Sequence, residues 1–207
     1  MPVKVKICGI TNLADAVAAA EAGADALGFV FYDLSPRCIS VEAAADLICK
    51  LPPLVMKVGV FVNAPEDLVV SAIRECDLNL LQFHGDELPE YCVQFGLMSM
   101  KAFRIRDAAS LRAVQSYPTD AWLLDAYVPD RLGGTGDTFN WDFALEARTW
   151  GRPIFLAGGL TPENVAEAVC HAKPYGVDVS SGVESAPGKK NHARVRAFIQ
   201  AAKSVET

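Results

Sequence analysis

Eight short apolar runs recur along the chain, and each is followed by a segment with helical spacing. The runs begin near Val3, Asp25, Val55, Leu78, Met98, Ala121, Pro153 and Gly176, at intervals of 20 to 32 residues. Amphipathic segments follow them at residues 13–22, 41–49, 65–75, 88–95, 108–114, 141–148, 162–171 and 193–203. Strands that alternate with helices in this way are parallel, because each helix carries the chain back across the sheet.

Two architectures accommodate such an alternation: a closed (βα)8 barrel and an open doubly wound sheet. Three features favour the barrel: the count of eight, the unbroken rhythm, and the lack of a G-x-G-x-x-G pattern after the first run. The length of 207 residues is near the lower limit of roughly 200 for such barrels, so its units must be short. We therefore predict an α/β fold, a single (βα)8 TIM barrel with a closed parallel sheet over residues 1–207, and keep the open sheet as the alternative.

The charge and the cysteine pattern exclude several classes of protein. A formal net charge of −6 gives no basic surface, so neither nucleic acid nor an anionic membrane is an expected partner. Charged residues interrupt every apolar stretch before the roughly 18 residues of a membrane span, and the first residues lack the apolar core of a secretory signal. The six cysteines form no C-x-x-C pair and the three histidines have no metal-ligand spacing. We expect a cytoplasmic protein with reduced thiols and no metal.

Polar and glycine residues gather where the predicted strands end. In chain order these are Cys8, Phe31, Asn63, His84, Arg104, Asp125, the pair Gly158 and Gly159, and the cluster Ser180, Ser181 and Gly182. Any one of them can be explained as a strand terminator. In a barrel, however, the carboxyl ends of all strands meet at one rim, where catalytic groups lie. The set as a whole predicts an active site at that rim.

The last two clusters have the character of an anion site. LAGGLTPENV and VDVSSGVE each place glycine before a predicted helix, and backbone N–H groups at a helix start bind phosphate. Barrels commonly hold phosphate after strands seven and eight. The alternative is a pair of tight turns that need glycine for their geometry. A further glycine loop, LGGTGDTF, follows Asp125 and is long enough to fold over a ligand.

Cys8 and Asp125 are the candidates for proton transfer. Strand alternation puts Val3, Val5 and Ile7 on one face and Lys6 and Cys8 on the other. A cation near a cysteine favours the thiolate, which can act as a base. Asp125 ends an apolar strand, and partial desolvation suits a carboxyl group to be a general acid. Together with a phosphate site, this pair predicts proton transfer on a sugar phosphate.

Seven motifs along the chain, in the same order as in the family, resemble the phosphoribosylanthranilate isomerase family of tryptophan biosynthesis. They are KICGIT, GFVF with SPR, VGVFVN, QFHGDE, LLDA with GGTG, LAGGLTPENV, and DVSSGVE with PGKK. The resemblance extends from about residue 4 to residue 200. It implies a (βα)8 barrel that catalyses, without cofactor or metal, the Amadori rearrangement of N-(5-phosphoribosyl)anthranilate to 1-(2-carboxyphenylamino)-1-deoxyribulose 5-phosphate. An acid opens the ribose ring and a base removes the proton from C2, roles that the resemblance gives to Asp125 and Cys8. The expected partner is this small phosphorylated substrate, bound by a monomer rather than a homodimer.

The resemblance also implies the residues that bind the substrate. Arg37 would pair with the anthranilate carboxylate, or else be an exposed loop arginine. His84 would lie near the anthranilate moiety, or else be a satisfied strand-end histidine. Asp178 would bind substrate oxygens, or else balance Lys6. Gly158, Gly159, Ser180, Ser181 and Gly182 would hold the phosphate, with Gly136 closing over it.

Three other functions are alternatives to this one. Indole-glycerol-phosphate synthase needs a lysine and glutamate set and a longer N-terminal segment, and neither is found. An isomerase that also accepts the histidine-pathway aldosamine needs a second phosphate site across the barrel mouth. A non-catalytic barrel that binds a phosphorylated ligand would not need both Cys8 and Asp125.

Overall fold

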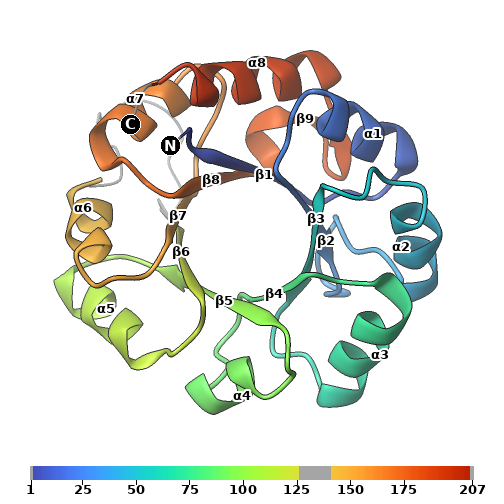
Figure 1. Ribbon diagram of the computed structural model, residues 1–207, viewed down its shortest axis with the longest axis horizontal. Helices are drawn as coiled ribbons and strands as arrows, with labels where there is room; N and C mark the ends of the chain where they lie inside the picture. The colour runs from blue at the N-terminus through green and yellow to red at the C-terminus, as the bar shows by residue number, and fades with distance from the viewer. Residues whose placement is uncertain (1, 126–140, 206–207) are drawn as a thin grey trace.

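Eight parallel strands close into a barrel in the order β1-β2-β3-β4-β5-β6-β7-β8 (Figure 1). The structure, a computed structural model, describes residues 2–125 and 141–205. The strands are β1 (Lys4–Cys8), β2 (Ala26–Val30), β3 (Met56–Phe61), β4 (Leu80–Phe83), β5 (Met98–Arg104), β6 (Ala121–Asp125), β7 (Ile154–Ala157) and β8 (Gly176–Val179). Hydrogen bonds between β1 and β8, with Lys6 opposite Asp178, close the sheet. An open sheet has no such pairing, so the predicted barrel is confirmed.

In the part of the chain that the structure describes, eight helices surround the barrel (Figure 1). They are α1 (Leu13–Glu21), α2 (Val41–Ile48), α3 (Glu66–Cys76), α4 (Pro89–Val93), α5 (Ala108–Ala113), α6 (Asp142–Arg148), α7 (Val165–Ala172) and α8 (His192–Lys203), with short 3-10 turns η1 (Val114–Ser116) and η2 (Ser181–Val183). Asn12, Ser40 and Asn191 accept hydrogen bonds from the first turns of α1, α2 and α8, as expected of helix caps. In residues 2–125 and 141–205, no helix has the length and hydropathy that a membrane span requires.

One expected helix begins later than its sequence suggests. We predicted a start at residue 162, yet α7 begins at Val165. The side chain of Asn164 accepts a hydrogen bond from the backbone N–H of Thr161 at 2.8 Å, and its amide donates to Gly159 O at 3.0 Å. These bonds hold residues 161–164 as a separate turn, because an asparagine side chain competes with the helical backbone for local partners.

Successive side chains of β1 point alternately toward the helices and into the barrel, as predicted. Val5 and Ile7 are buried between the barrel and its helices, whereas Cys8 packs inside the barrel against Val30 and Val60. Lys6 is also fully buried, with 1% of its surface exposed. The period of two residues along a strand therefore delivers a cation and a thiol to the barrel interior.

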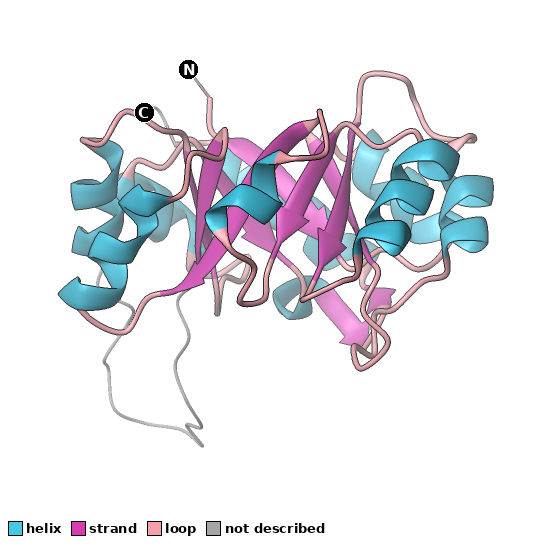
Figure 2. Cartoon of the chain, turned by 90° about the horizontal axis from the view of Figure 1, so that it is seen from below, coloured by secondary structure: helices cyan, strands magenta, loops and turns pink. Residues whose placement is uncertain are grey.

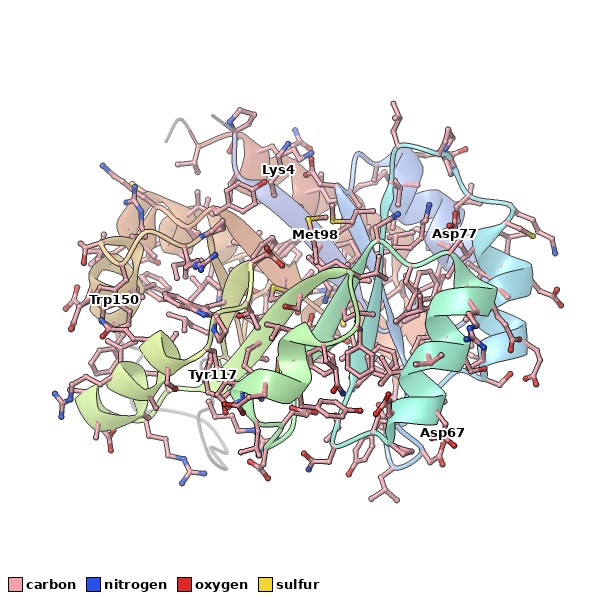
Figure 3. The ribbon with its side chains drawn as sticks, turned by 60° about the horizontal axis from the view of Figure 1, so that its bottom comes forward. Lys4, Asp67, Asp77, Met98, Tyr117 and Trp150 are labelled. Carbon is pink, nitrogen blue, oxygen red and sulfur yellow. The ribbon has the colours of Figure 1, made fainter. Side chains whose placement is uncertain are left out.

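The carboxyl ends of the strands lie at one end of the barrel. Figure 3 shows Lys4 and Met98, at the starts of β1 and β5, at one end, and Asp67, at the start of α3, near the other. A small antiparallel hairpin of β9 (Glu184–Ala186) and β10 (Lys189–Lys190) follows η2 and projects beyond the carboxyl ends of the barrel strands (Figure 2). This end of the molecule carries the site.

Candidate active site

A cavity of about 300 Å³ opens at the carboxyl ends of the strands. It is lined by Cys8, Arg37, Gln82, His84, Asp125, Ala157, Gly158, Gly159, Leu160, Asp178, Val179, Ser180, Ser181 and Gly182. Every described residue to which the resemblance gives a role is among the lining residues. Phe31, Asn63 and Arg104, which also end strands at the rim, are not, and Asn63 and Arg104 line a second cavity next to His84. Gly136 lies outside the described residues. Strand ends that are far apart in the chain meet here because the barrel brings all eight to one rim.

Cys8 ends β1 and is 8% exposed. Burial raises the pKa of the Cys8 thiol, the charge of Lys6 opposes that shift, and the result is a pKa above the ordinary value. The cation that the sequence predicted beside the thiol is present. Lys6 acts in the expected direction, toward the thiolate, but burial has the larger effect because it penalises the charged form.

Lys6 and Asp178 form a buried ion pair next to Cys8. The Lys6 ammonium nitrogen lies 2.8 Å from Asp178 Oδ1, and the two side chains are 1% and 9% exposed. Burial lowers the pKa of Lys6, but the charges of Asp178 and Cys8 more than offset it, so Lys6 stays protonated. Asp178 thus balances Lys6, as one of the two interpretations of the sequence proposed, while it also lines the cavity.

Asp125 is paired with His84 across the cavity. His84 Nε2 lies 3.3 Å from Asp125 Oδ2, and both side chains are 24% exposed. The amide nitrogen of Gln82 lies 3.0 Å from His84 Nδ1. An amide N–H that donates to Nδ1 leaves the ring proton on Nε2, directed at Asp125. The sequence analysis missed Gln82, although it lies two residues before His84 and therefore on the same face of β4.

The glycine and serine clusters after β7 and β8 form one wall of the cavity. Gly158 and Gly159 have φ angles of 85° and 63°, which other residues rarely adopt. A Cβ atom on Gly182 would overlap the carbonyl oxygen of Leu160. The hydroxyl of Ser180 is buried and has no hydrogen-bond partner within the described structure. The expectation that both clusters directly precede a helix is wrong. A turn separates Gly158 and Gly159 from α7, and Gly182 lies in η2, which the β9–β10 hairpin follows.

Arg37 lies at the edge of the cavity and is held by a carboxylate that the sequence analysis missed. Its Nε and Nη2 atoms donate to Glu184 at 2.8 and 2.7 Å. This bond and the charge of Glu184 raise the pKa of Arg37 further above its ordinary value, against the effect of burial. The side chain is 23% exposed, so Arg37 is not the freely exposed loop arginine of the alternative interpretation.

Within the described ranges, no group of three or more His, Cys, Asp and Glu side chains is placed to hold a metal ion. The charged groups of the cavity are instead arranged as pairs: lysine with aspartate, arginine with glutamate, and histidine with aspartate. Such a site can bind anions and move protons. Its chemistry fits acid and base catalysis on an anionic substrate.

Comparisons with known proteins agree with this chemistry. The sequence profile of the family described as N-(5'phosphoribosyl)anthranilate (PRA) isomerase matches residues 5–201. The N-(5'-phosphoribosyl)anthranilate isomerase of Geotalea uraniireducens is 56% identical over 202 residues, which cover 98% of this chain and 99% of that protein.

Two solved structures extend the likeness to the fold. One is a phosphoribosyl anthranilate isomerase in complex with reduced 1-(o-carboxyphenylamino)-1-deoxyribulose 5-phosphate, 41% identical with a TM-score of 0.89, covering 98% of this chain and all of that one. The other contains monomers generated from the dimeric phosphoribosylanthranilate isomerase of Thermotoga maritima, 40% identical with a TM-score of 0.87 and the same coverage. The matches confirm the TIM-barrel fold and the isomerase function in tryptophan biosynthesis that the sequence predicted. This chain belongs to the N-(5'-phosphoribosyl)anthranilate isomerase family.

Proposed function

We propose that this chain converts N-(5-phosphoribosyl)anthranilate to 1-(2-carboxyphenylamino)-1-deoxyribulose 5-phosphate with Asp125 as general acid and Cys8 as general base. The observation that carries the proposal is that both residues line one cavity, together with an arginine and the glycine and serine wall. One solved relative holds a reduced form of that ribulose phosphate, which supports a small phosphorylated molecule as the substrate.

Asp125 starts the reaction by protonating the ring oxygen of the ribose. The ring then opens and leaves a protonated Schiff base at C1. The imidazole of His84, whose Nε2 lies 3.3 Å from Asp125 Oδ2, orients the carboxyl group and stabilises the carboxylate that remains after the proton has left. A hydrogen-bond donor aimed at developing negative charge lowers the barrier for this step.

Cys8 takes the proton from C2 in the second step. The pair of Asp125 and Cys8 must start with one proton, carried by the carboxyl group, while Cys8 is the thiolate. Lys6 opposes the effect of burial on the thiol, and the cationic Schiff base, when it forms beside C2, favours the thiolate further. Loss of the C2 proton gives an enolamine, which tautomerises to the ketone.

Different residues of the cavity bind the substrate's two anionic ends. We assign the phosphate to the backbone N–H groups of Gly158, Gly159 and Gly182 with Ser181 and the unpaired hydroxyl of Ser180. Arg37 receives the anthranilate carboxylate, since guanidinium and carboxylate match in charge and geometry. Asp178 holds Lys6 and accepts a hydrogen bond from a substrate hydroxyl with its second oxygen.

We also propose that residues 1–207 form one domain that works as a monomer in the cytoplasm. The six free cysteines support that compartment. One relative is described as dimeric, so the oligomeric state needs its own measurement. Sedimentation at micromolar concentration should give the mass of one chain, and a dimer would contradict this part of the proposal.

Steady-state kinetics test the assignment. Purified protein should convert phosphoribosylanthranilate, and the rate should be the same after treatment with a chelator. Cys8→Ser and Asp125→Asn should each reduce kcat by at least about a hundredfold, while the reduced product analogue still binds. A wild-type rate equal to that of buffer would refute the function. Full activity of Asp125→Asn would refute only the role of that residue, and turnover of the histidine-pathway aldosamine would favour the dual-substrate alternative.

A further inference from the structure

The guanidinium of Arg37 is fixed before any substrate arrives. Glu184 accepts two hydrogen bonds from it, on Oε1 from Nε at 2.8 Å and on Oε2 from Nη2 at 2.7 Å. The Glu184 side chain is 5% exposed, so this is a bidentate pair at the edge of a cavity rather than a solvent-screened surface contact. Such a fork fixes the plane of the guanidinium as well as its position.

Glu184 is itself held by the β9–β10 hairpin. Its Oε1 atom accepts hydrogen bonds from Lys190 Nζ at 2.8 Å and from the backbone N–H of Gly188 at 3.3 Å. The Lys190 side chain is fully buried and its ammonium group also reaches the carbonyl oxygen of Ser180 at 3.4 Å. The hairpin therefore links Arg37, which we assign to the substrate carboxylate, to the loop at Ser180, which we assign to the phosphate.

The pairing leaves a defined part of Arg37 for the substrate. Glu184 takes the edge formed by Nε and Nη2, so the edge formed by Nη1 and Nη2 remains for a second carboxylate. Arg37 and Lys190 carry two positive charges against the one negative charge of Glu184, which keeps this cluster attractive to an anion. The stem of Arg37 also crosses Gly9, where a Cβ atom would lie 2.6 Å from Arg37 Cδ, so its path beside Cys8 is confined.

We propose that Glu184 is a positioning residue that sets the carboxylate specificity of the isomerase by presenting this edge of Arg37 to the anthranilate carboxylate. The proposal rests on the proposed function. A merely structural role, in which Glu184 fastens the hairpin, predicts a loss of stability with no change in the preference for a carboxylated ligand. The two roles are therefore separated by measuring that preference directly.

The measurement uses two stable ligands, reduced 1-(o-carboxyphenylamino)-1-deoxyribulose 5-phosphate and the same compound without its carboxyl group. Their dissociation constants are compared by calorimetry, and their ratio cancels every effect on phosphate binding. In the wild type we expect the carboxylated ligand to bind at least about thirtyfold more tightly. Glu184→Gln should reduce that ratio by about tenfold and raise KM for the substrate, with kcat changed by less than about threefold.

Asp25→Asn is the matched control at the other end of the barrel. Like Glu184, Asp25 is paired with two cations, Lys4 and Lys203, and accepts a hydrogen bond from one backbone N–H, that of Val5. The control should keep the wild-type ligand ratio even if it is less stable. Because Glu184→Gln leaves Lys190 buried without a carboxylate, the double variant Glu184→Gln/Lys190→Met is measured as well, and it should show the same loss of preference.

The variant Arg37→Ala shows whether the carboxylate preference depends on Arg37 at all, and so distinguishes a failure of this proposal from a failure of the assay. It should abolish the preference, and adding Glu184→Gln to it should change the ratio no further, because the two residues act as one unit. Wild-type preference in Glu184→Gln, alongside its loss in Arg37→Ala, would overturn the proposal. A wild-type protein that does not turn over phosphoribosylanthranilate would instead overturn the proposed function.

Discussion

Replacing Lys6 with methionine tests whether the buried ion pair supports both the fold and the base. Methionine keeps most of the side-chain volume but removes the ammonium group that lies 2.8 Å from Asp178. The Asp178 side chain, 9% exposed, is then a buried carboxylate without its cation. The Cys8 thiol loses the nearby positive charge that lowers its pKa. Burial and the charge of Asp178 still raise that pKa, and the weaker influence of the Lys190 charge still lowers it.

Two magnitudes follow from this geometry. Removing one partner of a buried ion pair costs about 3–5 kcal/mol of unfolding free energy, because the other charge stays desolvated. Each unit by which the pKa of Cys8 rises costs about 1.4 kcal/mol in forming the thiolate, which is a tenfold lower kcat/KM wherever the thiol is mostly protonated. The pH at which kcat/KM reaches its plateau should therefore shift upward in Lys6→Met.

Denaturant unfolding and a pH profile of kcat/KM measure the two effects separately. The double variant Lys6→Met/Asp178→Asn is the control for stability, since it removes both charges and should recover most of the unfolding free energy. A Lys6→Met variant within about 1 kcal/mol of the wild type, with an unshifted pH profile, would refute the reasoning. A loss of stability without a shift would show that Lys6 serves the fold and not the base.

Three smaller changes probe other parts of the structure. Gly28→Ala should reduce kcat by about a hundredfold in steady-state assays, because its Cβ atom would lie 2.8 Å from Cys8 Sγ. Gly182→Ala should weaken inhibition by inorganic phosphate, because the new Cβ atom would overlap the carbonyl oxygen of Leu160 and push two phosphate-facing loops apart. Asp15→Asn should make the melting temperature decrease less steeply as the pH is lowered into the acid range. Burial raises the pKa of Asp15, but the hydrogen bonds it accepts outweigh burial and hold that pKa below its usual value, so its stabilisation is present above about pH 4 and is lost as the pH falls further.

The barrel and most of the rim could be predicted because they follow from local rules. The alternation along β1 determines that Lys6 and Cys8 face inward, whatever the rest of the chain does. The rule that strand ends in a barrel converge then brings Cys8, His84 and Asp125 into one cavity, as the structure bears out. Neither step requires any knowledge of a distant contact.

The parts that could not be predicted depend on contacts between distant segments. Arg37 and Glu184 are 147 residues apart in the chain, and nothing in either segment indicates its partner. The pKa of Cys8 depends on a balance between burial and the charge of Lys6, and the sequence gives the sign of each influence but not which is larger. Gln82 is an intermediate case, because its position relative to His84 was a usable signal.

The way the cavity distributes charge explains how an acidic chain binds a substrate with two anionic ends. Lys6 is neutralised by Asp178, and Glu184 offsets one of the two positive charges of Arg37 and Lys190. The wall assigned to the phosphate contributes backbone N–H groups and a hydroxyl, not a lysine or arginine. A site with a single uncompensated positive charge and otherwise neutral donors attracts anions in general only weakly. Its affinity depends on where each donor points, and for this reason the residues that hold those donors, above all Asp178 and Glu184, matter as much as the donors themselves.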